Sequence, residues 1–143
     1  MLYASNSVLK KETEIIDALI VWMNRFSWED QKEERVFVLP LDAHGKVLAK
    51  PILVSVGSED GTTTIDAGAI FREALKAGAE EIIVAHNHPS GDPTPSKADY
   101  DTTKKLNDGA NLVGVELIDH LIIGAPESEN GLGFVSMAEL MAG

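Results

Sequence analysis

The chain has 143 residues and no cysteine, and its 12 Lys and Arg against 23 Asp and Glu give a net charge of −11. This length fits one domain with a substantial core, and the lack of cysteine excludes disulfides, thiolate metal sites and a cysteine nucleophile. An acidic surface repels phosphate backbones, so we expect no direct binding to nucleic acid. A cysteine-free chain whose apolar runs are too short to cross a bilayer fits a cytoplasmic protein with no membrane partner.

The N-terminal part predicts one amphipathic helix. Apolar residues recur at helical spacing through residues 8–26, whereas residues 27–33 are polar and indicate a loop. A helix with one apolar stripe packs that stripe against a sheet or another helix. We therefore expect residues 1–33 to form a helical extension packed on a single domain that spans residues 1–143.

A β-hairpin is predicted next. Residues 34–41 are rich in β-forming side chains, residues 42–45 have turn composition, and residues 47–57 return as a second strand. Pro40 cannot donate a hydrogen bond to a ladder, so we place it at a sheet edge or near the end of its strand. An edge at this position and long apolar strands are compatible with a homodimer. Residues 58–64 are polar and indicate a loop.

The middle of the chain predicts a helix, a buried strand and a constrained loop. Residues 67–77 have helical apolar spacing, and Gly78 is a typical C-terminal stop. Residues 81–85 form a short apolar run that indicates a buried strand. Residues 86–95 contain three prolines and a glycine, so they are predicted to form a loop.

The last third predicts a long helix and two further strands. Ser96 begins a helix that continues to about residue 112, and residues 114–124 are apolar on both alternating faces, as in a central strand. Residues 125–132 indicate a loop, and residues 134–136 a short strand before a terminal helix. The order of elements predicts an α/β fold of the α+β type, with helices flanking a mixed sheet.

The segment with the most chemical information is HNHPSGDPTPSKAD, which starts directly after the predicted buried strand. His86 and His88 are two residues apart, so on an extended backbone both imidazoles point to the same side. Asp99 lies one turn into the following helix and can reach back over the same loop. Two histidines and one carboxylate form a common zinc set, and three protein ligands leave the fourth tetrahedral position open for water.

Ordinary structural explanations exist for each of these residues alone. A His-x-His pair on a loop is more often two solvent-exposed polar side chains than a pair of metal ligands. A carboxylate at Asp99 suits the first turn of a helix because of the macrodipole, and Ser96 with Asp99 resembles a capping box. The combination of a buried strand, paired histidines, a constrained loop and Ser-x-x-Asp favours a metal site, and capping does not exclude a second role.

The spacing also carries a resemblance to a known family. His86-x-His88, seven residues, Ser96, two residues and Asp99 match the JAMM motif of JAB1/MPN metalloproteases, and HNHPSGDPTPS is similar to the RadC branch of that fold. LIDHLIIG at residues 117–124 and FVS at residues 134–136 also resemble RadC sequences. The resemblance covers roughly residues 34–140.

This resemblance implies a JAB1/MPN fold with cytidine-deaminase-like architecture and a Zn²⁺ site. His86, His88 and Asp99 would be the metal ligands, and Ser96 would support the developing oxyanion or orient the substrate. A glutamate on an earlier strand would be the general base; the family spacing points to Glu34, whereas a one-residue slip would point to Glu33.

The implied activity is that of a zinc-dependent metallopeptidase or isopeptidase, in which a zinc-activated water attacks an amide carbonyl of a protein or peptide-conjugate substrate. Two alternatives stay open: a DNA-repair or recombination accessory protein of RadC type, and a non-catalytic metal-binding scaffold. Two departures put the substrate in doubt. Residues 65–69 read IDAGA where RadC-like sequences have a His- and Arg-containing stretch, and residues 1–33 do not contain the family's helix-hairpin-helix region.

Smaller expectations concern the neighbouring polar residues. Asn87 and Pro89 are interpreted as residues that shape the loop. Asp119 and His120 resemble a family Asp-His pair, and structural hydrogen bonding is favoured over direct chemistry for both. His44 lies in the predicted hairpin turn and is expected to face solvent.

Overall fold

The computed structural model describes residues 33–57, 65–125 and 133–142. Within these ranges no helix combines the length and the apolar character that crossing a bilayer requires. The elements in chain order are β1 (Glu34–Leu41), β2 (Ile52–Gly57), α2 (Ala67–Lys76), β3 (Glu81–Asn87), α3 (Lys97–Val113), β4 (Glu116–Ile123), β5 (Phe134–Ser136) and α4 (Met137–Ala142). The predicted helix at 8–26 and the loops at 27–33, 58–64 and 125–132 fall wholly or mainly outside the described residues.

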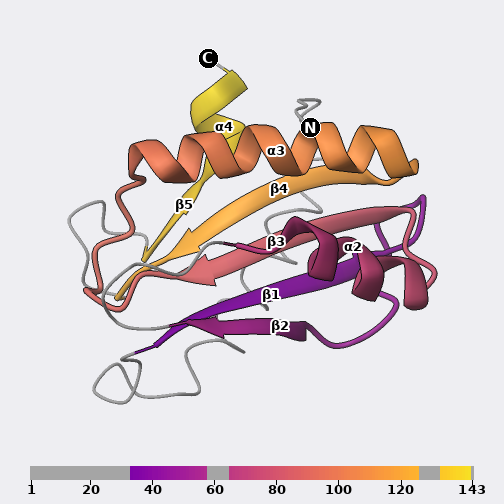
Figure 1. Cartoon of the computed structure of the whole chain (residues 1–143), viewed down its shortest axis with the longest axis horizontal. Helices are drawn as coiled ribbons and strands as arrows, with labels where there is room; N and C mark the ends of the chain where they lie inside the picture. The colour runs from indigo at the N-terminus through magenta and orange to yellow at the C-terminus, as the bar shows by residue number, and fades with distance from the viewer. Residues whose placement is uncertain (1–32, 58–64, 126–132, 143) are drawn as a thin grey trace.

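The strands form one mixed sheet in the order β2-β1-β3-β4-β5 (Figure 1). β3 and β4 are parallel, and α3 makes the crossover that a parallel pair requires. The pairs β1–β2, β1–β3 and β4–β5 are antiparallel. This arrangement confirms the predicted fold class, a mixed sheet with flanking helices.

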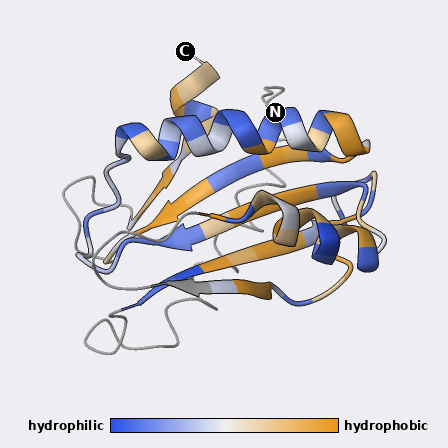
Figure 2. Cartoon of the chain, viewed as in Figure 1, coloured by the Kyte–Doolittle hydropathy of each residue, from blue (hydrophilic) through white to orange (hydrophobic). Residues whose placement is uncertain are grey.

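Apolar side chains are buried on both faces of the sheet, in two separate clusters. Along β1 the alternation is direct: Val36 and Val38 enter the cluster that α2 and α3 cover, whereas Phe37, Leu39 and Leu41 enter the cluster on the opposite face. Successive side chains of a strand point to opposite faces, so two buried faces require a nearly continuous apolar sequence. Figure 2 shows this as hydrophobic colour along the strands, with hydrophilic colour on much of α3.

The hairpin differs from its prediction. β2 begins at Ile52 rather than at residue 47, and Val47 forms only an isolated bridge with Leu41. Pro51 directly before β2 has no backbone N–H, which limits pairing on its N-terminal side. The Asp42 carboxylate accepts hydrogen bonds from backbone N–H groups of the turn at 2.8 and 2.9 Å, and this closes a turn rather than a longer ladder.

The pairing of the strands decides two predicted placements, that of Pro40 and that of the end of β3. Pro40 lies near the end of β1, and β1 is flanked by β2 and β3, so the strand-end interpretation is right and the edge interpretation is wrong. β3 continues through His86 and Asn87, beyond the predicted end at residue 85, because both residues pair with β4. The loop therefore begins at His88, and His86 is a strand residue.

α2 and α3 approach each other closely at Gly109. A Cβ atom at this position would lie 2.6 Å from Cε2 of Phe71, far inside contact distance. Phe71 is itself buried in the cluster under both helices. Glycine at position 109 is thus a packing requirement, although glycine disfavours the interior of a helix.

A buried carboxylate joins the last strands and helix. Asp119 in β4 accepts hydrogen bonds from Oγ of Ser136 at 2.6 Å, from the backbone N–H of Ala138 at 3.0 Å and from the backbone N–H of His120 at 2.7 Å. Burial raises the pKa of Asp119 to about 6, against the opposing effect of these three donors. Asp119 therefore fixes the start of α4 to β4, which agrees with the structural role expected for it.

The Gly109→Ala substitution should lower the free energy of unfolding by about 1–3 kcal/mol through overpacking against Phe71, despite the higher helix propensity of alanine. Urea unfolding measures the change. The double variant with Phe71→Leu should recover part of the loss, since the smaller side chain vacates the contact. An unchanged or increased stability of Gly109→Ala would contradict the close approach.

The pH dependence of stability tests Asp119. Its pKa is about 6 in the folded protein against an ordinary value of 3.8, so the folded state binds this proton more tightly. Its contribution to stability is therefore complete below about pH 4 and is lost as the pH rises to about 6, by about 3 kcal/mol in total. The free energy of unfolding of the wild type minus that of Asp119→Asn should fall across this window and then level off. A difference that is constant with pH would refute the shift.

Candidate metal centre

Four polar side chains from three elements meet at the end of β3. His86 is the penultimate residue of β3, His88 follows the strand directly, Asp99 lies in the first turn of α3, and Glu34 is the first residue of β1. His86 is fully buried, whereas the side chains of His88, Asp99 and Glu34 are 20%, 11% and 14% exposed. The site is thus mostly buried and remains partly accessible to solvent.

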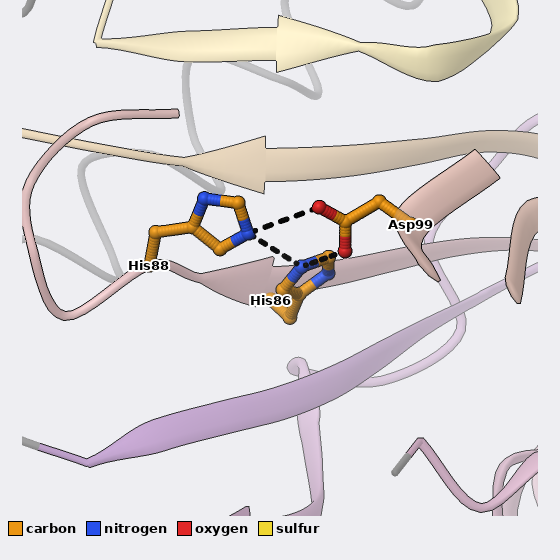
Figure 3. A group of neighbouring side chains, drawn as sticks. All are labelled: His86, His88 and Asp99. Carbon is orange, nitrogen blue, oxygen red and sulfur yellow. Dashed lines mark hydrogen bonds and ion pairs between the residues drawn. The ribbon is translucent and has the colours of Figure 1, made fainter. Parts of the chain in front are cut away.

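The distances within this group are those of a metal site (Figure 3). Nε2 of His86 lies 3.2 Å from Oδ1 of Asp99 and 3.3 Å from Nε2 of His88, and Nε2 of His88 lies 3.3 Å from Oδ2 of Asp99. Bonds of about 2.0–2.1 Å at tetrahedral angles, as in zinc sites, would place neighbouring ligand atoms about 3.3 Å apart. The three side chains therefore fit one small cation, and they form a group that could hold a metal ion.

The path of the chain after β3 explains the convergence of the two histidines. The N–H of His88 donates to the carbonyl of Ile123 at 2.9 Å, which keeps the backbone extended beyond the strand. The loop then turns at Gly91, whose φ of +87° favours glycine. A Cβ on Gly124 would lie 2.5 Å from the carbonyl oxygen of Gly91. The loop thus packs directly on the end of β4, and this contact fixes the position of His88.

Asp99 is held by the cap of α3. Ser96 is the N-cap residue, its hydroxyl accepts from the N–H of Asp99 at 3.2 Å, and its own N–H donates to Oδ2 of Asp99 at 2.8 Å. The hydroxyl of Ser96 also lies 3.0 Å from Oδ2. The capping-box prediction is confirmed, and the cap orients the carboxylate toward the histidines. The predicted role of Ser96 toward an oxyanion remains a prediction.

Glu34 lies beside the three-residue group. Its Oε1 is 3.7 Å from Nε2 of His86, and it shares a face of β1 with Val36 and Val38, as the alternation predicts. Glu33 is exposed and meets the site region through its backbone, since its carbonyl accepts from Nδ2 of Asn87 at 3.1 Å. Of the two glutamates, Glu34 is therefore the one whose carboxylate approaches the site.

Two contributions at the site were missed by reasoning from sequence. Asn87, interpreted as a loop residue, belongs to β3, and its amide bonds the carbonyl of Glu33 and the N–H of Arg35, at 3.1 and 2.6 Å. Asn87 thus fixes the backbone on both sides of Glu34. Thr103 contacts His120 and the carbonyl of Asp99; its spacing of one helical turn from Asp99 was the available signal.

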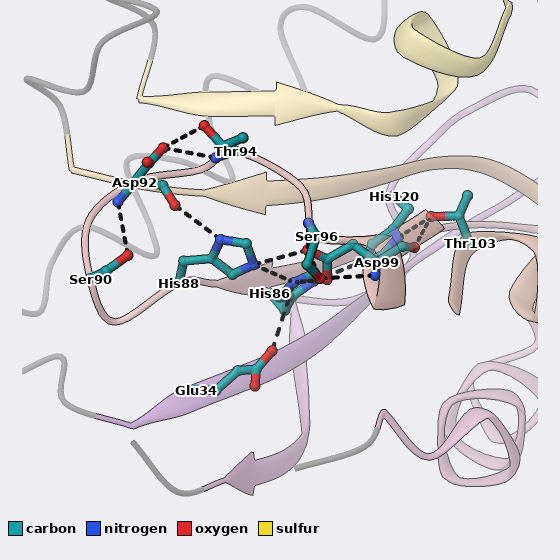
Figure 4. A network of polar contacts seen from close by, with 10 residues as sticks. All are labelled: Glu34, His86, His88, Ser90, Asp92, Thr94, Ser96, Asp99, Thr103 and His120. Atoms are coloured by element: carbon teal, nitrogen blue, oxygen red, sulfur yellow. Dashed lines mark hydrogen bonds and ion pairs between the residues drawn. The ribbon is translucent and has the colours of Figure 1, made fainter. Parts of the chain in front are cut away.

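Both histidines of this group use their second ring nitrogen for a hydrogen bond (Figure 4). Nδ1 of His88 lies 2.9 Å from the carbonyl oxygen of Asp92, and Nδ1 of His86 lies 2.9 Å from Nε2 of His120. Such outer contacts orient metal-ligating imidazoles. His120 is fully buried, as its expected structural role requires, and His44 is exposed, as predicted.

The charges of the group suit a cation. Burial alone would raise the pKa of Asp99, but contacts with His86, His88 and the N–H of Ser96 hold it well below the ordinary value. Burial opposes protonation of His88, yet Asp99 and the Asp92 carbonyl raise its pKa overall. Burial keeps the pKa of His120 well below the ordinary value, so this ring is neutral near pH 7. An ionised carboxylate thus faces two imidazole nitrogens.

Sequence comparison relates the chain to UPF0758 proteins. The chain is 42% identical over 100 residues to a UPF0758 protein of Carboxydothermus hydrogenoformans, which covers 70% of this chain and 43% of the relative. It is 39% identical over 95 residues to a UPF0758 protein of Methanosarcina mazei, covering 66% and 41%. A UPF0758 protein of Geobacillus is 51% identical over 70 residues, covering 49% and 28%.

These alignments span less than half the length of the relatives. The family model for the RadC-like JAB domain, in contrast, matches residues 11–142, which is nearly the whole chain. This range contains every strand of the sheet and all four residues at the end of β3. The chain therefore belongs to the family of RadC-like JAB domains.

Proposed function

We propose that this chain is a zinc-dependent, JAMM-type hydrolase of amide bonds. The proposal is carried by one observation: one ligand atom each of His86, His88 and Asp99 lie within 4.8 Å of one another, with the Glu34 carboxylate 3.7 Å from Nε2 of His86. Membership of the RadC-like JAB family supports the same assignment. The substrate class that fits is a protein or peptide conjugate.

The donor set favours zinc among common metals. Two imidazoles and one carboxylate, without thiolate, are a frequent zinc combination, and three protein ligands leave one position open. Bound zinc would lower the pKa of a coordinated water toward about 7 and polarise a carbonyl oxygen. Ca²⁺ and Mg²⁺ prefer oxygen-rich sites, which the two histidines disfavour.

Glu34 is proposed to move the proton in this reaction. Its carboxylate is partly exposed beside the proposed ligands, with Asn87 fixing the backbone on either side. From this position it can take a proton from the attacking water and return it to the leaving amine, as a general base and then a general acid. Ser96 holds Asp99 and is proposed to orient the substrate or donate to the developing oxyanion.

Metal binding can be tested with matched histidine variants. The wild type should bind about one zinc per chain, whereas His88→Ala should lose more than the roughly 100-fold in affinity that an outer partner can cost. His44→Ala, in the exposed turn, is the control and should bind zinc as the wild type does. Metal content after gel filtration and zinc titration with a competing chelator measure both. A wild type that binds no zinc, or an equal loss of zinc affinity in the two variants, would contradict the proposal.

The role of Glu34 can be separated from metal binding. Glu34→Gln should retain zinc but lower turnover about 10²- to 10⁴-fold, the usual worth of a general base. Glu33→Gln, the exposed neighbour, should keep both. Cleavage of a peptide library with and without chelator gives the readout. Full activity of Glu34→Gln would remove Glu34 from the reaction, and metal binding without any hydrolysis in the wild type would favour a scaffold function.

A further inference from the structure

A chain of hydrogen bonds leads from His86 back to the helix that carries Asp99. Nδ1 of His86 lies 2.9 Å from Nε2 of His120, Nδ1 of His120 lies 2.7 Å from Oγ1 of Thr103, and Oγ1 of Thr103 donates to the carbonyl oxygen of Asp99 at 2.9 Å. His86, His120 and Thr103 each have no exposed surface. Water therefore cannot substitute for a missing partner within this relay.

The carbonyl at the end of the relay sets the direction of every proton in it. A carbonyl only accepts, so the single hydrogen of the Thr103 hydroxyl is used there. Nδ1 of His120 must then carry the hydrogen that it shares with Thr103, and in a neutral ring this leaves Nε2 as an acceptor. His86 in turn donates from Nδ1, which leaves its Nε2 facing His88 and Asp99.

The opposite direction would disable the site. If Thr103 donated to His120 instead, His120 would donate from Nε2 to Nδ1 of His86. The hydrogen of His86 would then sit on Nε2, which lies 3.2 Å from Oδ1 of Asp99 and would bond that oxygen. A protonated ring nitrogen has no lone pair for a metal, so this hydrogen would have to leave Nε2 before a metal could bind.

His88 reaches the same tautomer by a shorter route. Its Nδ1 contacts the carbonyl of Asp92 directly, and a carbonyl requires the hydrogen on Nδ1. Among the described residues, Nδ1 of His86 contacts instead the ring of His120, which can either donate or accept. Which ring nitrogen of His86 carries the hydrogen therefore depends on His120, and through His120 on Thr103.

We propose that Thr103 and His120 are positioning residues that set His86 as the Nδ1–H tautomer before a metal arrives. Neither residue touches the reacting atoms; both act through His86. The tautomer itself is a property of the metal-free protein. Its consequence for metal affinity rests on the metal binding proposed above.

Long-range ¹H–¹⁵N NMR of the metal-free protein at about pH 8, where free imidazoles are neutral, reads the tautomer of each histidine. In the wild type, His86 and His120 should both be protonated at Nδ1. Thr103→Ser keeps the hydroxyl and should keep this pattern. Thr103→Val removes the hydroxyl, so His120 should shift its hydrogen to Nε2 and His86 should follow, a change that altered packing alone would not produce.

Zinc titration of the same proteins provides the second readout. Thr103→Val should bind zinc about 10- to 100-fold more weakly, the usual effect of an outer partner, and Thr103→Ser should bind within a few-fold of the wild type. Thr102→Val, one position along the same helix and less buried, is the matched control and should change neither readout. Thermal unfolding confirms that the variants are folded.

Two results would overturn the inference. One is a metal-free wild type with the hydrogen of His86 on Nε2, which needs no variant to observe. The other is a folded Thr103→Val protein with wild-type tautomers and zinc affinity. If the wild type shows the expected tautomers but binds no zinc, the proposed function fails and the tautomer assignment stands.

Discussion

The close approach of His86, His88 and Asp99 is the interaction on which the rest of this site depends. Three polar groups lie 3.2–3.3 Å apart with little exposed surface, and partly buried polar groups are costly unless each has a partner. The neighbouring residues supply these hydrogen-bond partners. The Ser96 cap holds the carboxylate, the Asp92 carbonyl holds His88, and His120 holds His86.

The sheet makes this convergence possible because strand pairing on both sides fixes the backbone near the ends of its inner strands. β3 is paired on both sides, with β1 antiparallel and β4 parallel, and both of its faces are buried. His86 therefore has one orientation, on the face that α3 covers. The register also places Val36 opposite His86, so Glu34, two residues earlier on the same face, extends toward the histidines.

The candidate metal centre and the stretch at residues 65–69 differ in how closely they resemble RadC sequences. The candidate metal centre lies within the range that matches the RadC-like JAB domain, and the loop around Gly91 and the cap at Ser96 support it. Where the resemblance leads one to expect a His- and Arg-containing stretch, Asp66 instead accepts from the N–H of Ala69 at 3.1 Å and caps α2. At this position the departure serves helix formation.

Several features of this protein followed from local sequence, because they depend on short-range spacing. Apolar residues on both alternating faces of residues 114–124 predicted a central strand, and Ser-x-x-Asp predicted the capping box at Ser96. The JAMM spacing pointed to His86, His88 and Asp99. These patterns arise within one element or one loop, where backbone geometry fixes which side chains can meet.

Other features required the tertiary structure, since they join residues far apart in sequence. Strand pairing extended β3 to Asn87 and made β1 an inner strand, which composition alone could not decide. The relay from His86 through His120 to Thr103 joins β3, β4 and α3. The sequence by itself determined which groups could bind a metal, because residue type and spacing define that chemistry. Only the tertiary structure decided how these groups are oriented, because the partners that hold them come from other strands and helices.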